Sequence, residues 1–162
     1  VLLRRAAPRG MTVVLAITLF PVAFIAMWCG VIWLLGRVSG WQRLGQHYAY
    51  RGEIRGVSRG FQSAMMGYSR WRLVRYRACL NVTVDSGVLI LKPWFIFGLF
   101  QPPLGIPLHD LVRAERTFLF WTFCELRAAP EPRIRILVSL RLANWIERQA
   151  GGPILSAKAR DF

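Results

Sequence analysis

The stretch "GVLILKPWFIFGLFQPPLGIPL", Gly87–Leu108, decides how many times this chain crosses a membrane. It is mostly apolar and about as long as a membrane span. Lys92 and four prolines interrupt it, and its longest run without a charge or a proline is the 8 residues from Trp94 to Gln101. A helical span needs roughly 20 apolar residues, so we predict that this stretch does not cross a bilayer.

The left flank of this stretch predicts a β-hairpin. In "CLNVTVDSGVLIL", Cys79–Leu91, apolar residues alternate with polar ones from Leu80 to Val84, which is the period of a half-buried strand. Asp85-Ser86-Gly87 then supplies turn residues, and Val88–Leu91 follows as a buried returning strand. The prolines further on favour an irregular edge or a loop.

A better candidate span lies upstream, in "MTVVLAITLFPVAFIAMWCGVIWLLG", Met11–Gly36, which contains no charged residue. As a helix it would be about 39 Å long, enough for a hydrocarbon core of roughly 30 Å. No small-residue cleavage site follows it, so we predict an uncleaved anchor. Trp28 and Trp33 lie toward its C-terminal end, where indoles favour the interface. Ala26 and Gly30 are four residues apart, a spacing that allows a homodimer through close helix pairing.

The rest of the chain predicts more strands and two short helices. Strands are expected at Phe61–Met66, Trp71–Val84, Arg116–Arg127 and Arg133–Ser139, the last with Arg133 and Arg135 pointing outward. One helix is expected at Trp41–Tyr48 and one from Ser139, as N-cap, to the Gly151-Gly152-Pro153 stop. We expect one shared core that includes Leu80, Val82, Val84, Leu89, Leu91, Ile134, Ile136, Val138 and Ile146.

The predicted fold class is α+β, mainly β: one N-terminal transmembrane helix, then an antiparallel β-barrel or sandwich, then a C-terminal helix. The predicted organisation is a basic N-terminal flank (1–10), a transmembrane helix (11–36), a juxtamembrane helix and linker (37–60), a β domain (61–150) and a flexible tail (151–162).

Several short motifs between residues 41 and 110 resemble a known group of proteins. They are Trp41-x-x-Leu44-x-x-x-Tyr48, Ser63-Ala64-x-Met66-Gly67, Tyr76-x-x-Cys79-Leu80-x-Val82, Gly87-Val88-x-Ile90 and Pro102-Pro103-Leu104-x-Ile106-Pro107. The group consists of small, uncharacterised bacterial single-pass membrane proteins with a PH-like (GRAM-like) soluble domain. The resemblance implies this fold and a membrane tether, and it brings no catalytic residues. Where the group often has a histidine before the paired prolines, this chain has Gln101.

Composition points to an anionic partner. The 162 residues are 54% hydrophobic and carry 22 Lys+Arg against 8 Asp+Glu, a formal charge of +14. Such a balance suits an anionic lipid surface or a nucleic acid. The densest basic segment is "SRWRLVRYR", whose candidate lipid- or phosphate-binding residues are Arg70, Arg72, Arg75, Arg77, Trp71 and Tyr76. Residues two apart share one face of a strand, so the four arginines form two pairs, either on opposite faces or brought together by a bulge.

Catalysis is not predicted. The chain has no phosphate-binding loop, dinucleotide fingerprint or nucleophile elbow, and its two histidines and few carboxylates favour neither a metal site nor a cofactor. We therefore predict a non-catalytic module that binds anionic lipid headgroups or a partner membrane protein. Two alternatives stay open: a small membrane enzyme or an accessory subunit of one, and nucleic-acid binding through the arginine-rich strand, which the tether disfavours.

The expected location is the bacterial inner membrane, with the domain in the cytoplasm. Arginine counts on the two sides of the span are balanced, and translation from Met11 would remove those on the N-terminal side. The strongly basic domain suits the anionic cytoplasmic leaflet. Cys79 and Cys124, the two cysteines outside the span, form no disulfide framework and fit a reducing compartment.

Overall fold

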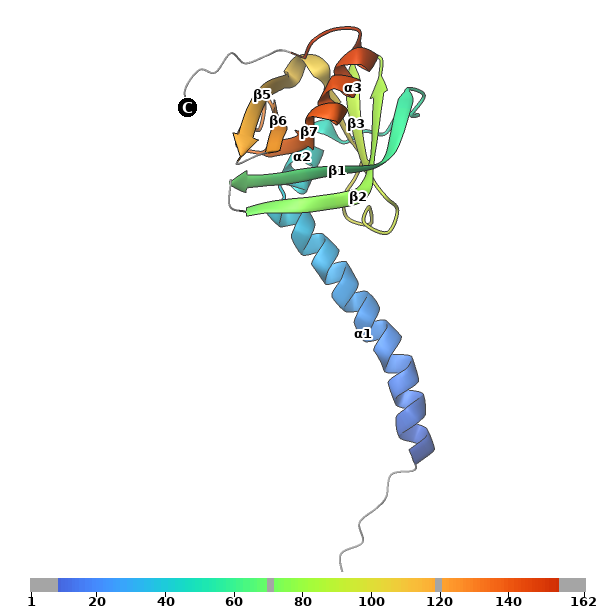
Figure 1. Cartoon of the computed structure of the whole chain (residues 1–162). Coiled ribbons are helices and arrows are strands. Elements are labelled where there is room, and N and C mark those ends of the chain that lie inside the picture. The colour runs from blue at the N-terminus through green and yellow to red at the C-terminus, as the bar shows by residue number, and fades with distance from the viewer. Residues whose placement is uncertain (1–8, 70–71, 119–120, 155–162) are drawn as a thin grey trace, which may run out of the picture.

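A long, exposed helix, α1 (Arg9–Val38), precedes the folded domain (Figure 1). The computed structural model describes residues 9–69, 72–118 and 121–154. In this part of the chain α1 is the one helix long and apolar enough to cross a membrane, over Val13–Val38, with a mean hydropathy of 2.3 and 6% of its apolar window buried. Ala26 and Gly30 are exposed, and no atom lies within 4 Å of a Cβ placed on Gly30.

A sharp turn joins α1 to a short helix, α2 (Trp41–Tyr48), which lies where the sequence predicts it. Gly40 makes the turn with a φ of 82°, and a Cβ at this position would lie 2.8 Å from Cδ1 of Ile134. The sequence predicts α2 as a juxtamembrane element, but in the structure its apolar stripe is part of the core of the domain. The buried residues of α2 are Trp41, Leu44 and Tyr48.

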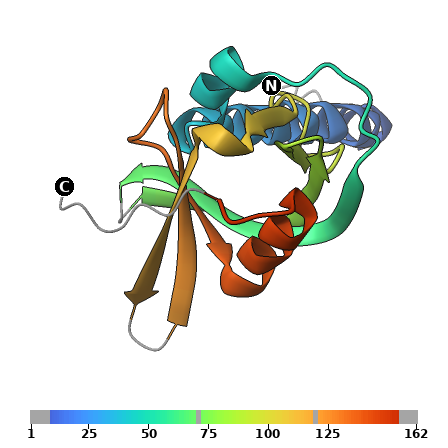
Figure 2. The same cartoon turned by 90° about the horizontal axis from the view of Figure 1, so that it is seen from above.

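Seven antiparallel strands form one curled sheet, a half-barrel, in the order β4-β3-β2-β1-β7-β6-β5 (Figures 1 and 2). The strands are β1 (Val57–Ser69), β2 (Arg72–Asp85), β3 (Val88–Pro93), β4 (Leu104–Pro107), β5 (Leu111–Phe118), β6 (Trp121–Ala128) and β7 (Arg135–Ser139). A 3-10 turn, η1 (Leu108–Asp110), joins β4 to β5, and α3 (Leu140–Ala150) follows β7. The fold is α+β and mainly β, with an apolar helix before the sheet and a helix after it, as predicted.

The β2–β3 hairpin confirms the strand reading of Gly87–Leu108. Asp85 pairs with Val88 across a two-residue loop, and both loop residues, Ser86 and Gly87, have positive φ (48° and 81°). Positive φ at both positions matches the right-handed twist of the flanking strands. The rest of Gly87–Leu108 forms β3, a turn-rich connection, β4 and the first residue of η1, and it contains no α-helix.

The predicted core is confirmed: all nine of the residues expected to share it are buried in one cluster. α3 packs against β2, β6 and β7 and contributes Leu142, Ala143, Trp145 and Ile146 to this cluster. Its N-cap is Ser139, whose hydroxyl accepts a hydrogen bond from the N–H of Leu142. The cap satisfies one of the N–H groups that a helix start leaves without a partner.

Two expectations differ from the structure. Arg116–Arg127 is not one strand but the end of β5 and most of β6, which pair with each other. No glycine, proline or asparagine stands between Arg116 and Arg127 in the sequence, so the pattern reads as continuous. Within the predicted tail (151–162), Ile154 is packed: it is 3% exposed and its N–H donates to Oε1 of Glu147. Residues 155–162 of the tail and most of the N-terminal flank lie outside the described residues.

Candidate functional site: an arginine-lined groove

The face of the sheet opposite the core carries one continuous row of side chains across five strands. Arg75 on β2 pairs with Met65 on β1, which pairs with Leu137 on β7. Leu137 pairs in turn with Glu125 on β6, and Glu125 with Ala114 on β5. Because side chains alternate between the two faces of a strand, the core neighbours of this row point the other way.

This face forms a groove of about 1270 Å³, which we call the outer groove. Figure 2 shows the β5–β6 hairpin projecting at an angle from the β1–β2 pair, which makes the face concave. The apolar residues of the groove include Met65, Leu73, Phe123 and Leu137, and its arginines are Arg75, Arg77, Arg116 and Arg135. An apolar floor with a basic rim suits a ligand that carries both an anionic group and an apolar part.

The structure divides the predicted basic cluster. Arg70 and Trp71 lie outside the described residues. Arg75 and Arg77 are both exposed and line the outer groove, whereas Arg72 is exposed but does not line it. Tyr76 also borders the outer groove, but its side chain is 4% exposed and is part of the core cluster.

Strand alternation explains this arrangement, because Arg75 and Arg77 are two residues apart with Tyr76 between them, and a bulge follows further along β2. Leu80 pairs with Gln62 and Tyr76 with Ala64, so four residues of β2 advance against two of β1. Ala78 has a φ of 49°, a conformation that non-glycine residues seldom adopt. This bulge adds two residues to β2 between Tyr76 and Leu80, so both of these side chains still face the core.

Tyr76 ties this part of β2 to the end of α1. Its hydroxyl donates a hydrogen bond of 3.0 Å to Oγ of Ser39, the residue after the last one of α1, and its ring centroid lies 5.4 Å from that of Trp41. Burial is the main reason why the pKa of Tyr76 is raised to about 12. The backbones of Arg75 and Arg77 are each one strand step, about 3.3 Å, from Tyr76, in a strand that contacts α1, while their side chains point to the opposite face of the sheet.

Glu125 organises the other wall of the groove. It is 2% exposed, and its Oε1 accepts a hydrogen bond of 2.6 Å from Nε of Arg127. The Nε atoms of Arg135 and Arg116 lie 3.5 Å from Oε1 and Oε2 respectively. A buried carboxylate needs such partners, and three guanidinium groups around one carboxylate leave the wall with a positive charge. In the part of the chain that the structure describes, no carboxylate pairs with Arg75 or Arg77.

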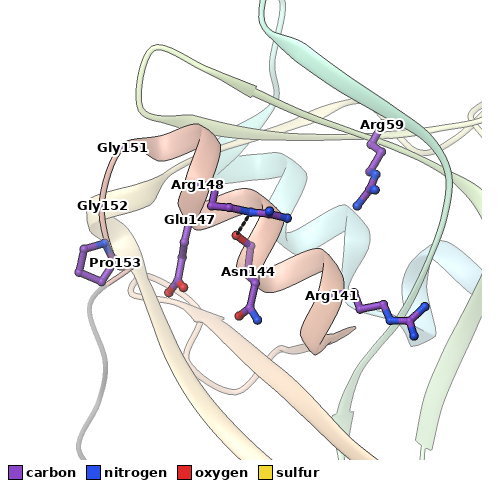
Figure 3. Close-up of a pocket in the computed structure, with 8 residues that line it drawn as sticks. All are labelled: Arg59, Arg141, Asn144, Glu147, Arg148, Gly151, Gly152 and Pro153. Carbon is purple, nitrogen blue, oxygen red and sulfur yellow. Dashed lines mark hydrogen bonds between the residues drawn. The ribbon is translucent and has the colours of Figure 1, made fainter.

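A second basic hollow, of about 930 Å³, lies over α3 (Figure 3). Arg59 of β1 and Arg148 of α3 extend toward each other across it, while Glu147 points away, toward its ion pair with Arg113. The guanidinium of Arg59 lies 5.6 Å from the ring of Trp145. α3 lies on the side of the domain away from α1 (Figure 1), so this hollow does not face the candidate span.

The histidines, cysteines and carboxylates of the described residues are dispersed. No group of three or more histidines, cysteines or carboxylates is placed to hold a metal ion within the described ranges. The three cysteines are free, and burial is the main cause that raises the pKa of Cys124 to about 11. A thiol with such a pKa stays protonated and is a poor nucleophile at neutral pH.

The sequence reading missed Arg116, Phe123 and Glu125 as parts of the site. Strand alternation gave a usable signal for Arg135, which was expected to point outward. For Arg116, Phe123 and Glu125, alternation could not assign a face, because Arg116–Arg127 was predicted as one strand rather than two. In comparisons with protein-family models, curated proteins and solved structures, no match to this chain was found.

Proposed function

We propose that this chain is a single-pass membrane protein whose β domain binds the phosphate group of an anionic lipid in the outer groove, without catalysis. The observation that carries the proposal is the hydrogen bond between Tyr76 and Ser39. It ties the segment of β2 that carries Arg75 and Arg77 to the end of α1, the level at which lipid headgroups would lie if α1 spans a bilayer. Guanidinium groups form paired, charge-assisted hydrogen bonds with phosphate.

The finer fold assignment is part of the same proposal. Seven antiparallel strands followed by a C-terminal helix are consistent with a PH-like domain, which the sequence motifs also favour. We further propose that the domain lies on the cytoplasmic side of a bacterial inner membrane, where anionic lipids attract basic segments by about 1 kcal/mol per residue. Alkaline phosphatase fused to the C-terminus tests this orientation, since it is active only after export. Strong activity would place the domain outside.

The ligand is tested on the full chain in detergent micelles. A short-chain phosphatidylglycerol, the matching phosphatidylcholine and inorganic phosphate are each titrated, and binding is followed by thermophoresis. We expect the anionic lipid to bind more tightly than the other two probes. Tighter binding of inorganic phosphate would mean that the groove recognises a free anion instead.

The variants compare two pairs of arginines. Replacing both Arg75 and Arg77 by alanine should weaken binding of the anionic lipid about tenfold or more, because each charge-assisted hydrogen bond contributes roughly 1.5–3 kcal/mol. The matched control replaces Arg133 and Arg141, which are also exposed and lie outside the groove. Equal losses in the two double variants would indicate a non-specific charge effect. Tight binding of an oligonucleotide with no lipid binding would favour the nucleic-acid alternative.

A further inference from the structure

The connection between β3 and β4 carries an exposed group of large apolar side chains. We call residues Trp94–Gln101 the aromatic loop. No residue between Lys92 and His109 is charged. The most exposed large side chains of the aromatic loop are Trp94 (43%), Phe95 (74%), Leu99 (61%) and Phe100 (40%). Soluble surfaces seldom leave such a contiguous group uncovered, so it marks an interaction surface.

The aromatic loop lies against α1, and this contact indicates what covers it. The ring centroids of Phe97 and Trp28 are 5.8 Å apart, and Figure 1 shows the β3–β4 connection beside the upper part of α1. Further along α1, the guanidinium of Arg37 lies 5.1 Å from the ring of Trp33. Tryptophan and arginine at one level of an apolar helix are typical of the membrane interface.

The depth of the loop follows from the helix rise. Trp28 precedes Trp33 by five residues, which is about 7–8 Å along α1. From Val13 to Trp33 the helix covers about 30 Å, the thickness of a hydrocarbon core. With Trp33 at the interface, Phe97 therefore lies about 7–8 Å inside it, within the roughly 5–10 Å depth to which interfacial segments insert.

The backbone of the aromatic loop is suited to this depth because it forms its own hydrogen bonds. The N–H groups of Phe97 and Gly98 donate to the carbonyl of Trp94 at 2.8 and 2.9 Å. The N–H of Trp94 donates to the carbonyl of Cys79 at 2.7 Å, and that of Gln101 to Gly98 at 3.2 Å. Unpaired backbone groups are costly in hydrocarbon, and these pairings remove several of them.

Phe61 on β1 extends the same surface. Its ring centroid lies 6.2 Å from that of Trp94, and its side chain is 70% exposed. Phe61 has a φ of 52° and lies at an irregularity in the β1–β2 register, between Arg59 and Gln62. Strained backbone of this kind persists where the direction of a side chain matters, and here it turns a phenyl ring toward the loop.

We propose that the aromatic loop and Phe61 insert into the same bilayer interface from which α1 emerges. The loop enters and leaves on one side, so it is a second membrane contact and not a second span. This contact goes beyond the proposed headgroup site and shares with it only the requirement that α1 spans the membrane. Together with α1, it would fix the orientation of the domain and hold the outer groove near the headgroups.

Photo-crosslinking to lipid tests the insertion. The full chain is reconstituted into vesicles of phosphatidylcholine and phosphatidylglycerol, with benzoylphenylalanine at position 95 or, separately, at position 99. Ile25 on α1, 60% exposed, provides the positive control position, and Gln149 on α3, also exposed, the negative one. After irradiation, lipid adducts are counted by mass spectrometry. We expect adduct yields at 95 and 99 close to the yield at 25, and none at 149.

The outcomes separate the two proposals. Adducts at 25 without adducts at 95 and 99 would overturn the inserted loop and leave the tether intact. No adducts at 25 would show that α1 does not span the bilayer, and both proposals would fail. Adducts at 95 and 99 combined with lipid affinity that does not depend on Arg75 and Arg77 would support the loop and overturn the headgroup site.

Discussion

Arg127 and Arg135 lie directly opposite each other on β6 and β7, and the buried carboxylate of Glu125 contacts both. Like charges at opposed positions of an antiparallel pair destabilise it, so Glu125 offsets a repulsion that the register creates. The same carboxylate also lies near Arg116, which brings a third cationic side chain to the wall of the outer groove. Glu125 is therefore expected to determine both the stability of this wall and its charge.

Glu125→Gln should lower the free energy of unfolding by about 3 kcal/mol, because it leaves the surrounding arginines without their buried counter-charge. Urea unfolding of the full chain in micelles, followed by tryptophan fluorescence, measures this. Glu115→Gln is the control: Glu115 also pairs with an arginine but is 60% exposed, so its loss should cost less than about 1 kcal/mol. Equal effects of the two substitutions would contradict the assigned role of Glu125.

Tyr76→Phe should cost about 1 kcal/mol, because it removes the hydrogen bond to Ser39 and keeps the ring in the core. The same unfolding measurement applies. Tyr68→Phe alters a tyrosine that is 37% exposed, and it should change the free energy of unfolding by a few tenths of a kcal/mol at most. If Tyr76→Phe were as stable as the wild type, the bond between α1 and β2 would be unimportant for folding.

Stability should fall between pH 10 and pH 12 through Tyr76. Its pKa is about 12 in the folded protein and near 10 in an unfolded chain, so the folded state holds the phenol proton more tightly. The stabilisation is complete below pH 10 and is lost as the pH rises through 12, about 2–3 kcal/mol in all. Comparison of the wild type with Tyr76→Phe isolates this contribution, and parallel pH profiles would refute it.

Val82→Asp should unfold the domain, since Val82 is 1% exposed and an unpaired buried charge costs several kcal/mol against a total of roughly 5–15. The matched control is Val57→Asp, because Val57 lies at the start of β1 and is 54% exposed. Circular dichroism of both variants in micelles would report the loss of sheet. A folded Val82→Asp protein would show that the core is arranged differently.

Gly40→Ala should destabilise the turn between α1 and α2 by more than about 1 kcal/mol. The φ of 82° is unfavourable for a residue with a Cβ, and that atom would meet the side chain of Ile134 at 2.8 Å. Gly152→Ala is the control, because no atom lies within 4 Å of its Cβ position. Thermal unfolding of the two variants should differ by several degrees, and identical midpoints would argue against a required glycine.

The local sequence pattern was sufficient to predict several helices and strands. The uncharged run before Arg37 predicted α1, alternation with a Ser-Gly turn predicted the β2–β3 hairpin, and Ser139 with a helical period predicted α3. Each depends on residues close together in the chain, whose periodicity and turn chemistry report burial directly. The same reading failed to separate β5 from β6, since the sequence between Arg116 and Arg127 contains no glycine, proline or asparagine.

The tertiary structure alone decided which residues share the outer groove and which helix the aromatic loop lies against. Arg75 and Glu125 line the same groove because the sheet order places β2, β1, β7 and β6 side by side. Long-range pairing sets this order, and local periodicity does not encode it. Alternation along β2 already places Arg75 and Arg77 on one face and Tyr76 on the other, but only the fold shows that the arginines line the groove and that Tyr76 reaches Ser39. The contact of Phe97 with Trp28 likewise depends on how the sheet packs beside α1, because residues so far apart in sequence meet only after the domain has closed.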